Sequence, residues 1–374
     1  MSRSRVIFDG GPLDGGTAFL TPHRIIQATD PAEVPKALSL MEEAQSQGFW
    51  LAGYMSYELG YLFSQKLHRL LPNARTMPLL RFGVFSGPRP VDPNECFTAD
   101  AELTLPTPDW DFETYAEAFE VIHDYIVAGD IYQANLTFGM TAQRRGSIDA
   151  LYAKLRTRQK AQYGALVDLG GEVLLSRSPE LFFSLDASGV LKARPMKGTV
   201  ARADTPEQDA GNRRWLQNSA KNRAENLMIV DLLRNDLSRI SEIGSVKVPK
   251  LFSIETYTTL HQMTSTITSQ MRGGVTISEI FKALFPCGSI TGAPKIRVMQ
   301  ILHSIENQPR DAYCGSIGWI APDGSMSFNV AIRTLICSDA GEVRLNVGGG
   351  IVYDSNAKEE YAEALLKAKF ASHL

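Results

Sequence analysis

Short polar turns between apolar runs are the feature that most limits how this chain can fold. The turns Asp186–Gly189, Pro322–Gly324 and Asp339–Gly341 each separate two short apolar stretches. Strands joined by so few residues pair antiparallel, because a parallel pair needs a crossover of about a dozen residues or more. Helical periodicity occupies other segments. The predicted class is therefore α+β, with large antiparallel sheets flanked by helices, and not a doubly wound parallel sheet.

The spacing of apolar residues predicts the individual elements. Strands are expected where apolar and aromatic residues alternate or run together, and helices where they recur at three- and four-residue steps. The expected helices cover 34–47, 111–128, 223–240 and 357–370. The expected strands cover 49–57, 172–176, 181–185, 190–194, 316–320, 327–337 and 343–347.

A proline-rich stretch divides the sequence. Five prolines lie between residues 84 and 110, and proline lacks the amide hydrogen that a central strand needs. We predict an N-terminal, sheet-forming subdomain over 1–110, with 84–110 as its connection, and a second domain over 111–374.

Charge and cysteine content exclude several classes of function. The 38 Lys and Arg residues nearly balance the 41 Asp and Glu residues, for a net charge of −3, which disfavours binding to nucleic acid or to an anionic membrane surface. No apolar run approaches the roughly 20 residues of a spanning helix. The four cysteines are far apart and form no C-x-x-C pair. These features predict a reduced, cytoplasmic protein.

The last predicted helix carries an acidic face that follows a glycine triplet. Glu360 and Glu363 are three residues apart and Lys367 follows Glu363 by four, so all three share one face. A divalent cation such as Mg²⁺ would offset the two carboxylates, although spacing alone favours a solvated face on which Glu363 pairs with Lys367. The glycines Gly348–Gly350 let the backbone approach a ligand, or form a flexible turn.

Two further positions suggest chemistry from their surroundings. Glu225 begins a predicted helix, where it is either a metal ligand or a partner of the helix dipole. Lys197 stands where a strand breaks, next to Gly198. A lysine nucleophile must lose its proton, which desolvation and a cationic neighbour such as Arg194 favour; the alternative is a surface lysine at a turn.

Three more side chains have a functional and a structural interpretation each. Arg333 is a charge within an apolar strand, suited to binding a carboxylate or to a sheet edge. His261 donates to an oxyanion or is hydrogen-bonded in the core. Glu180 precedes aromatic residues, where a raised pKa would make it an acid, or it is a surface carboxylate at a strand end.

The longer motifs together resemble one known family. The segments Arg194–Thr199, Lys221–Leu237, Cys287–Lys295, Tyr313–Gly318 and Gly348–Ser355 are similar, in sequence and in order, to motifs of the chorismate-utilising enzymes. The resemblance covers roughly residues 111–370. It implies that family's fold, Mg²⁺ as cofactor and chorismate as substrate.

The resemblance also assigns roles by position. It implies Mg²⁺ ligands at Glu225 and Glu363 with Glu360 nearby, a catalytic acid at Glu180, and a histidine near the ring carboxylate at His261. It implies substrate contacts at Gly198, Thr199, Tyr313, Arg333, Gly348, Gly349, Gly350, Lys367 and Gln133.

Two positions sort the chain within the family. Family members that add water to chorismate have a lysine base at the position where this chain has Gln133. Because this chain lacks that base, the resemblance implies that ammonia and not water is the nucleophile. Anthranilate synthases have alanine at the position of Lys197. The aminodeoxychorismate synthases have lysine there, and this chain is similar to them in that respect. This similarity implies a covalent intermediate on Lys197. The rivals are an anthranilate synthase component I and a non-catalytic chorismate-binding relative.

The resemblance has consequences for partners. No G-x-C-x-G thiol elbow is present, so a separate glutamine amidotransferase subunit (component II) is expected to supply ammonia. The L-L-E-S element with which anthranilate synthases bind tryptophan is also missing, so inhibition by tryptophan is not expected.

Overall fold

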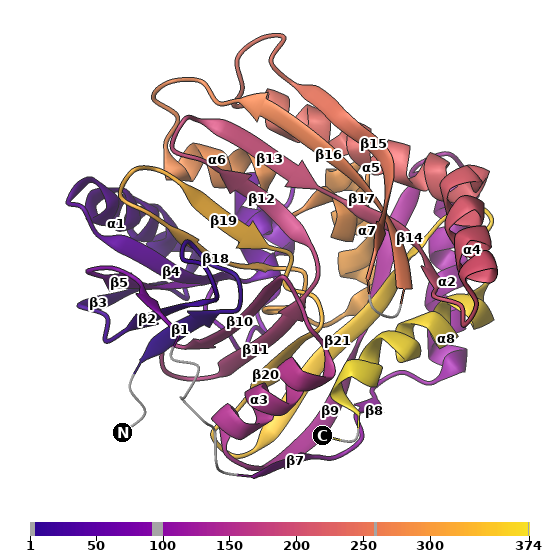
Figure 1. Ribbon diagram of the computed structural model, residues 1–374, viewed down its shortest axis with the longest axis horizontal. Coiled ribbons are helices and arrows are strands. Elements are labelled where there is room, and N and C mark those ends of the chain that lie inside the picture. Colours follow the sequence, from indigo (N-terminus) through magenta and orange to yellow (C-terminus); the bar gives the residue numbers. More distant parts are fainter. Residues whose placement is uncertain (1–3, 92–99, 258–259, 373) are drawn as a thin grey trace.

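Two large antiparallel sheets packed face to face form the body of the protein (Figure 1). The structure is a computed structural model that describes residues 4–91, 100–257, 260–372 and 374. Within those residues, one sheet has 11 strands and the other has 10. The pairs of neighbouring strands are antiparallel. The predicted α+β class is confirmed.

The bounds of the strands follow the order of the two sheets. The 11-stranded sheet runs β17 (Gly292–Ala293), β9 (Gln133–Gly146), β21 (Glu342–Ile351), β20 (Thr334–Cys337), β11 (Val173–Ser178), β10 (Tyr163–Asp168), β1 (Arg5–Phe8), β2 (Thr17–Leu20) and β6 (Arg89–Pro90), with β7 (Ala101–Leu103) and β8 (Thr107–Pro108) beside β9. The 10-stranded sheet runs β14 (Met196–Ala201), β16 (Leu260–Gln270), β13 (Val190–Arg194), β12 (Leu181–Leu185), β19 (Met326–Asn329), β18 (Ser316–Ile320), β4 (Trp50–Met55), β5 (Leu80–Phe85) and β3 (Arg24–Ala28), with β15 (Lys247–Thr256) beside β16.

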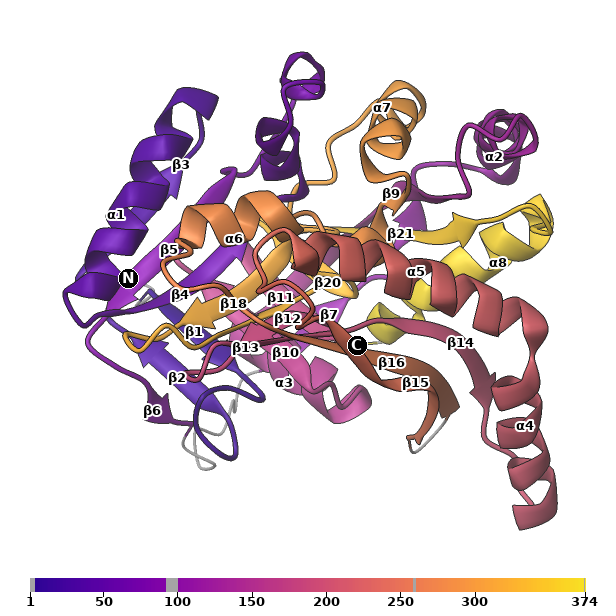
Figure 2. The same cartoon turned by 90° about the horizontal axis from the view of Figure 1, so that it is seen from above.

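Helices lie on the outer faces of the sheets (Figure 2). They are α1 (Val34–Ser46), α2 (Phe112–Val127), α3 (Ile148–Arg158), α4 (Pro206–Asn218), α5 (Ala220–Ser238), α6 (Ile277–Leu284), α7 (Lys295–Glu306) and α8 (Ala357–Lys367). Short 3₁₀ helices cover Pro31–Glu33, Tyr57–Phe63, His68–Leu70, Gly288–Ile290 and Ala368–Ala371. Among the residues that the structure describes, no helix has the length and apolar character that a membrane span requires.

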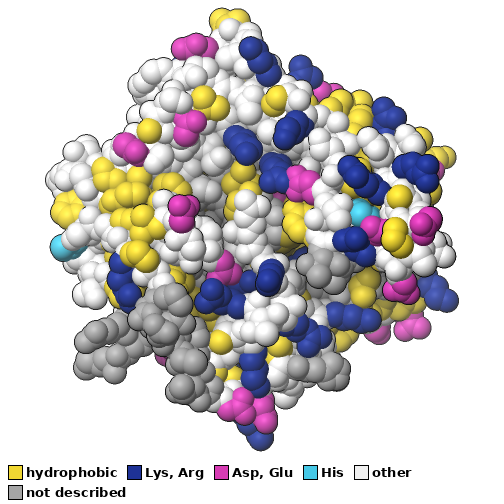
Figure 3. Space-filling model, in the orientation of Figure 1, with side chains coloured by type: hydrophobic (Ala, Val, Ile, Leu, Met, Phe, Trp, Pro, Cys, Tyr) yellow, Lys and Arg dark blue, Asp and Glu magenta, His cyan; other side chains and the backbone are white. Residues whose placement is uncertain are grey.

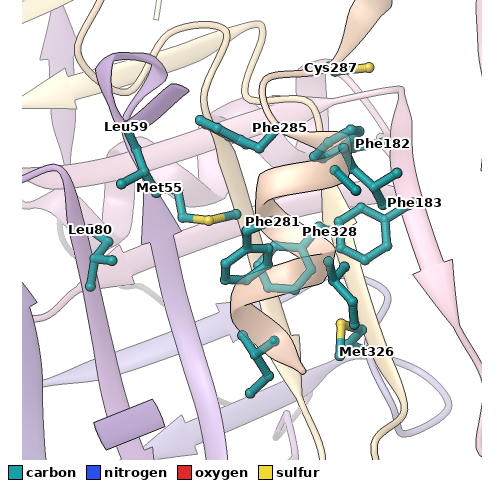
Figure 4. Close-up of a cluster of buried hydrophobic side chains, with 14 of the residues drawn as sticks. Met55, Leu59, Leu80, Phe182, Phe183, Phe281, Phe285, Cys287, Met326 and Phe328 are labelled. Carbon is teal, nitrogen blue, oxygen red and sulfur yellow. The ribbon is translucent and has the colours of Figure 1, made fainter. Parts of the chain in front are cut away.

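The buried side chains form three clusters, which follow the layers. One lies between the two sheets, and another packs α2, α3, α7 and α8 onto the 11-stranded sheet. The third packs α1, α5 and α6 onto the 10-stranded sheet. In this third cluster, Phe281 of α6 meets Phe328 edge-on at 5.4 Å, and Phe183 of β12 stacks on Phe328 at 5.3 Å (Figure 4). These rings fix the start of β12, which matters for the site described below.

The N-terminal segment shares both sheets with the rest of the chain. Strands β1, β2 and β6 continue the sheet of β10 and β11, and β3, β4 and β5 continue the sheet of β18 and β19. Residues on either side of the proline-rich stretch therefore build common cores, because neither segment has a complete sheet of its own. The predicted division into an N-terminal subdomain over 1–110 and a second domain over 111–374 stays a prediction from the sequence. Residues 92–99 of the connection lie outside the described part of the chain.

Two predicted elements are wrong in a way that affects the site. The expected strand 327–337 is two strands, β19 and β20, which belong to different sheets. The chain changes sheet at residues 330–333, where Arg333 has a φ of 51°. The glycines Gly348–Gly350 do not follow a strand but lie inside β21, paired with Thr137, Leu136 and Asn135 of β9. Pairing with the long strand β9 keeps these three glycines extended. A run of glycines does not by itself favour an extended conformation.

Most other expected elements are present. The helices α1, α2, α5 and α8 start or end within three residues of the predicted bounds, and strands β12, β13 and β18 match theirs. Three cysteines, Cys287, Cys314 and Cys337, are buried free thiols, and Cys96 lies outside the described residues.

Candidate active site

Gly198 brings strand β14 against the start of helix α5. It has a φ of 84°, and a Cβ atom at this position would lie 2.7 Å from Asn222 Oδ1. Only glycine meets both conditions without strain. Since Asn222 precedes Glu225 by less than one helical turn, this close approach places Lys197 of β14 beside Glu225 of α5.

Lys197 lies among charged groups from helices α5 and α8 and from the residue just before β12. Burial lowers the pKa of Lys197 below its ordinary value. The carboxylates of Glu225, Glu180 and Glu363 act in the opposite direction, and the ammonium group of Lys367 lowers the pKa further. A Cβ atom at Gly350 would lie 2.9 Å from Lys197 Nζ, so the amine rests against strand β21. A partly desolvated amine of lowered pKa is the form of lysine that can act as a nucleophile.

Glu180 is a buried carboxyl group held by a serine. Ser289 Oγ donates a hydrogen bond of 2.7 Å to Glu180 Oε1, and both residues are buried. Burial raises the pKa of Glu180 to about 7, although Ser289, Lys197 and Arg333 all favour its charged form. Glu180 stands directly before β12, whose Phe182 and Phe183 are anchored in the aromatic cluster of Figure 4. A carboxyl group with a pKa near neutrality is suited to donate a proton.

Arg333 lies where the chain crosses between the sheets. Burial lowers the pKa of its guanidinium group, and Glu180 opposes that shift, so the two side chains are electrostatic neighbours. The turn that carries Tyr313 adjoins this segment, because Cys314 N donates to Ala331 O and Ala331 N donates to Gly315 O, each at 3.0 Å. Tyr313 itself is buried beside Cys314 and Arg310.

Helix α8 brings its acidic face against β21. Lys367 Nζ is 2.9 Å from Glu363 Oε1 and donates to the main-chain oxygen of Gly348 at 2.8 Å. Ser355 Oγ donates to Glu360 Oε1 at 2.7 Å.

Burial and neighbouring charges shift the pKa values of Glu360 and Glu363 of α8 in opposite directions. Burial raises the pKa of Glu360, and Glu363 adds to the shift. Partial burial alone would raise the pKa of Glu363 as well, but Lys367, Lys197 and Lys221 together hold it below its ordinary value. Within the described residues, no three His, Cys, Asp or Glu side chains stand in metal-binding geometry.

Gln133 is an unsatisfied amide inside the site. Its side chain is fully buried, and neither Nε2 nor Oε1 has a hydrogen-bond partner among the described residues. A Cβ atom at Gly350 would lie 2.8 Å from Gln133 Nε2 and 2.9 Å from Lys197 Nζ, so amide and amine flank the same glycine. Buried amides are normally paired, and an unpaired one beside reactive groups is what a bound ligand would satisfy.

His261 and Thr199 are engaged with other protein groups. The two ring nitrogens of His261 lie 2.9 Å from Asp209 Oδ1 and 2.9 Å from Thr256 Oγ1. Both nitrogens are therefore occupied, and the predicted catalytic role of His261 stays a prediction. Thr199 Oγ1 donates to Gln262 Oε1 at 2.8 Å.

The surface near these elements is rich in positive charge. Lys and Arg side chains gather on the face where β14, α4 and α8 lie (Figure 3). Although the whole chain has a net charge of −3, this face would attract an anionic small molecule.

Comparison with known proteins decides the family. Residues 14–373 match the profile of a family described as chorismate binding enzyme. The chain belongs to the chorismate binding enzymes. It is 43% identical over 261 residues to aminodeoxychorismate synthase component 1 of Klebsiella aerogenes, which is 70% of this chain and 57% of that protein. It is 42% identical over 275 residues to the protein of the same name from Escherichia coli K12, which is 72% of this chain and 60% of that one.

Solved structures of other proteins share the fold. Anthranilate synthase component I from Streptococcus pneumoniae superposes with a TM-score of 0.82 at 24% identity, covering 99% of this chain and 93% of that one. A putative isochorismate synthase, DhbC, from Bacillus anthracis gives 0.76 at 19% identity, covering 99% and 95%. These two likenesses concern the fold alone. The aligned regions span 57–60% of the length of the two curated relatives.

Among the predicted site residues of this chorismate binding enzyme, the structure groups one set around Lys197. That set comprises Lys197, Glu180, Arg333, Glu225, Glu363, Lys367, Gln133 and Gly350. Sequence reasoning missed Ser289 as a functional residue. Its signal was its place inside the motif Cys287–Lys295, but only the fold shows that its hydroxyl reaches Glu180.

Proposed function

We propose that this chorismate binding enzyme is an aminodeoxychorismate synthase component I, which converts chorismate and ammonia to 4-amino-4-deoxychorismate for para-aminobenzoate and folate biosynthesis. The names of the relatives that are 42–43% identical support this reaction. The position of Lys197 carries the proposal within the family, because its amine lies against Gly350 with Glu180 and Arg333 nearby.

The proposed mechanism is covalent. Neutral Lys197 attacks C2 of chorismate, both ring double bonds shift by one position, and the C4 hydroxyl leaves as water with a proton from Glu180. Ammonia then forms a bond to C4, both double bonds shift back, and the C2–N bond to Lys197 breaks. The raised pKa of Glu180 and the lowered pKa of Lys197 support these two roles, since each favours the required protonation state.

Carboxylate donors are available for Mg²⁺. Glu225 of α5 and Glu363 of α8 would hold the ion, with Glu360 nearby. Their carboxylate oxygens suit this hard cation. Burial raises the pKa of Glu360 and the charge of Glu363 adds to the shift, and a bound cation would favour the charged carboxylate instead. When bound, Mg²⁺ would supply positive charge for the ring carboxylate of chorismate.

The remaining residues are proposed to bind and orient chorismate. Arg333 and Lys367 provide positive charge, and a guanidinium group suits a planar carboxylate. The glycine segment of β21 allows the substrate to approach the backbone closely. The amide of Gln133 is placed to donate or accept a hydrogen bond that the protein itself leaves unmade. Gly198, Thr199, Tyr313, Gly348 and Gly349 are assigned to the same surface by the family resemblance.

Ammonia is proposed to come from a glutamine amidotransferase subunit, component II. At neutral pH free ammonia is mostly protonated and has no lone pair to attack C4. A partner that releases NH₃ next to the site avoids this loss. A cytoplasmic location is the expectation consistent with this folate-forming role.

A product assay tests the proposal. The purified chain is incubated with chorismate, Mg²⁺ and ammonium at about pH 8.5, and an added lyase converts 4-amino-4-deoxychorismate to para-aminobenzoate. Wild type should form product, Lys197→Ala should not, and the exposed Lys192→Ala control on β13 should match wild type. Without ammonium, acid-quenched wild type should gain the mass of one chorismate less one water. Formation of anthranilate, or no turnover of chorismate, would contradict the proposal.

A further inference from the structure

Arg310 is a buried arginine just after helix α7 in the chain. It is 2% exposed. Its side chain forms a bidentate ion pair with Glu306, the last residue of α7: Nε donates to Oε2 at 2.8 Å, and Nη2 donates to Oε1 at 2.6 Å. The guanidinium group also lies 4.5 Å over the ring of Tyr57. This arrangement holds the guanidinium group in one orientation, because its planar fork matches both oxygens of a carboxylate.

Other N–H groups of Arg310 reach two main-chain oxygens. Nη1 donates to Ile290 O at 3.2 Å, and Nη2 donates to Asn135 O at 2.7 Å. Asn135 belongs to β9, and Ile290 follows Ser289 in a short 3₁₀ helix. We call residues 287–291, which include that helix, the serine turn. Buried carbonyl groups need a donor, and here one side chain supplies it to both segments, so Arg310 joins the serine turn to β9.

The serine turn depends on contacts from outside. The amides of Ile290 and Thr291 donate within the turn at 3.4 Å each, which is longer than an ordinary N–H···O bond. A shorter bond comes from β9, because Asn135 N donates to Thr291 O at 2.9 Å. Arg310 therefore fixes the turn twice, directly at Ile290 and indirectly through Asn135.

The position of the serine turn has a chemical consequence. Ser289 Oγ donates a hydrogen bond of 2.7 Å to Oε1 of Glu180, the proposed acid. Such a bond weakens steeply when its geometry is disturbed, so the place of the turn decides how firmly the carboxyl group is held. The positive charges that act on Glu180 come from Lys197 and Arg333. Arg310 reaches the acid by contact instead, through the serine turn.

We propose that Arg310 is a positioning residue for the reaction: its guanidinium group fixes the serine turn in the place from which Ser289 holds Glu180. The inference deepens the proposed function and rests on it for the role of Glu180 as the acid. A purely structural arginine would also stabilise the fold, but its replacement would leave Glu180 unchanged. The two cases therefore differ in the titration of Glu180 and not in thermal stability.

Arg310→Lys tests the contact at constant charge. Lysine can keep the ion pair with Glu306, but its single nitrogen cannot repeat a planar fork that also serves two carbonyl groups. The carboxyl band of Glu180, identified by its loss in Glu180→Gln, is titrated by infrared spectroscopy without chorismate. The pKa of Glu180, about 7 in the wild type, should rise by about one in the variant, because the weakened bond no longer stabilises the carboxylate.

Arg177→Lys is the matched control. Arg177 is 1% exposed, pairs with Asp9, and donates through Nε and Nη2 to Gln159 O at 3.0 and 2.6 Å. Its replacement also disturbs a buried arginine that binds a carboxylate and a main-chain oxygen, so it should lower Tm without moving the pKa of Glu180. If Arg310→Lys does not fold, Arg310→Met/Glu306→Gln removes the buried charge pair and has the same expected effect on Glu180.

A double-mutant cycle with Ser289→Ala shows whether the effect passes through the hydroxyl group. Ser289→Ala should raise the pKa of Glu180 by itself, because it removes the bond. In that background, Arg310→Lys should not raise the pKa further, since no hydroxyl group is left to position. Additive shifts in the double variant, or an unchanged pKa of Glu180 in Arg310→Lys, would overturn the proposal.

The product assay adds a readout of the reaction. The kcat/KM of Arg310→Lys relative to wild type should be lower at about pH 6 than at about pH 9, because Glu180 loses its proton at a lower pH in the wild type. A ratio independent of pH would overturn the role in catalysis. The infrared titration needs no turnover, so the expected pKa shifts without formation of 4-amino-4-deoxychorismate would refute the proposed function and leave the contact between Arg310 and the serine turn supported.

Discussion

Removal of the Ser289 hydroxyl tests how the proposed acid is controlled. In the wild type, Ser289 Oγ donates a hydrogen bond of 2.7 Å to Glu180 Oε1. This bond stabilises the charged carboxylate, so Ser289→Ala should raise the pKa of Glu180. The other groups that act on Glu180 are Lys197 and Arg333, both positive, and neither is changed by the substitution. The thiol of Cys287, 3.2 Å from Ser289 Oγ, has a pKa raised by burial to about 12 and stays neutral.

The magnitude follows from the bond. A hydrogen bond to a charged group contributes about 1.5–3 kcal/mol, and one pKa unit corresponds to about 1.4 kcal/mol. The pKa of Glu180, about 7 in the wild type, should therefore rise by about one to two units. At about pH 8.5 the protonated fraction would grow from about 3% to between about a quarter and three quarters. The substitution also frees the carboxyl from its hydrogen bond, which should lower the rate at low pH.

The assay is the ratio of variant to wild-type kcat/KM from about pH 6 to pH 9, with saturating ammonium and Mg²⁺. The ratio cancels the titration of ammonia, which affects both proteins alike. It should rise about ten- to fifty-fold across this range, because the wild type loses its acid at a lower pH than the variant does. Ser56→Ala is the matched control, since Ser56 is also fully buried and donates a 2.7 Å bond, to Pro78 O. A ratio that does not change with pH would refute the role of Glu180 as the acid that Ser289 holds.

Three further outcomes are expected. Gly350→Ala would place a Cβ atom 2.9 Å from Lys197 Nζ, so the amine must move, and the ammonia-dependent rate should fall about tenfold or more with little change in Tm; an unaltered rate would contradict the placement of the amine. Glu225→Gln and Glu363→Gln should each weaken Mg²⁺ binding measured by calorimetry about tenfold or more, and equal affinities would remove these residues from the metal site. Burial raises the pKa of Glu58 to about 8, so the folded protein keeps a proton that the unfolded chain releases, and the free energy of unfolding should fall by about 1.4 kcal/mol per pH unit between about pH 4.5 and 8. Glu58→Gln should remove that slope, and parallel curves of Tm against pH for the two proteins would show that Glu58 does not titrate this way.

Local patterns were sufficient for much of the secondary structure. The α2 helix is predictable because its apolar residues recur on one face, Asp111 caps its first turn, and Gly129 with a φ of 79° ends it. The hairpin of β12 and β13 is predictable because Asp186 turns the chain with its own side chain, which accepts from the amides of Ser188 and Val190. Such signals lie within a few residues of the element they specify.

The family motifs also identified residues far apart in the sequence. Lys197, Glu225 and Glu363 come from three different elements, and no local pattern relates them. Their assignment to one site came from the resemblance alone, and the pKa shifts place their charges near one another.

What the sequence determined by itself is the antiparallel class, most element bounds and the identity of the reactive side chains, because these depend on short-range periodicity, turn chemistry and motifs. The tertiary structure decided the crossing between sheets at Arg333, the extended glycines of β21, the bond from Ser289 to Glu180 and the unpaired amide of Gln133. Each of these depends on a partner more than 100 residues away or on a neighbouring strand. A long-range contact forms only when the sheets pack, so its geometry cannot be read from the residues on one side of it.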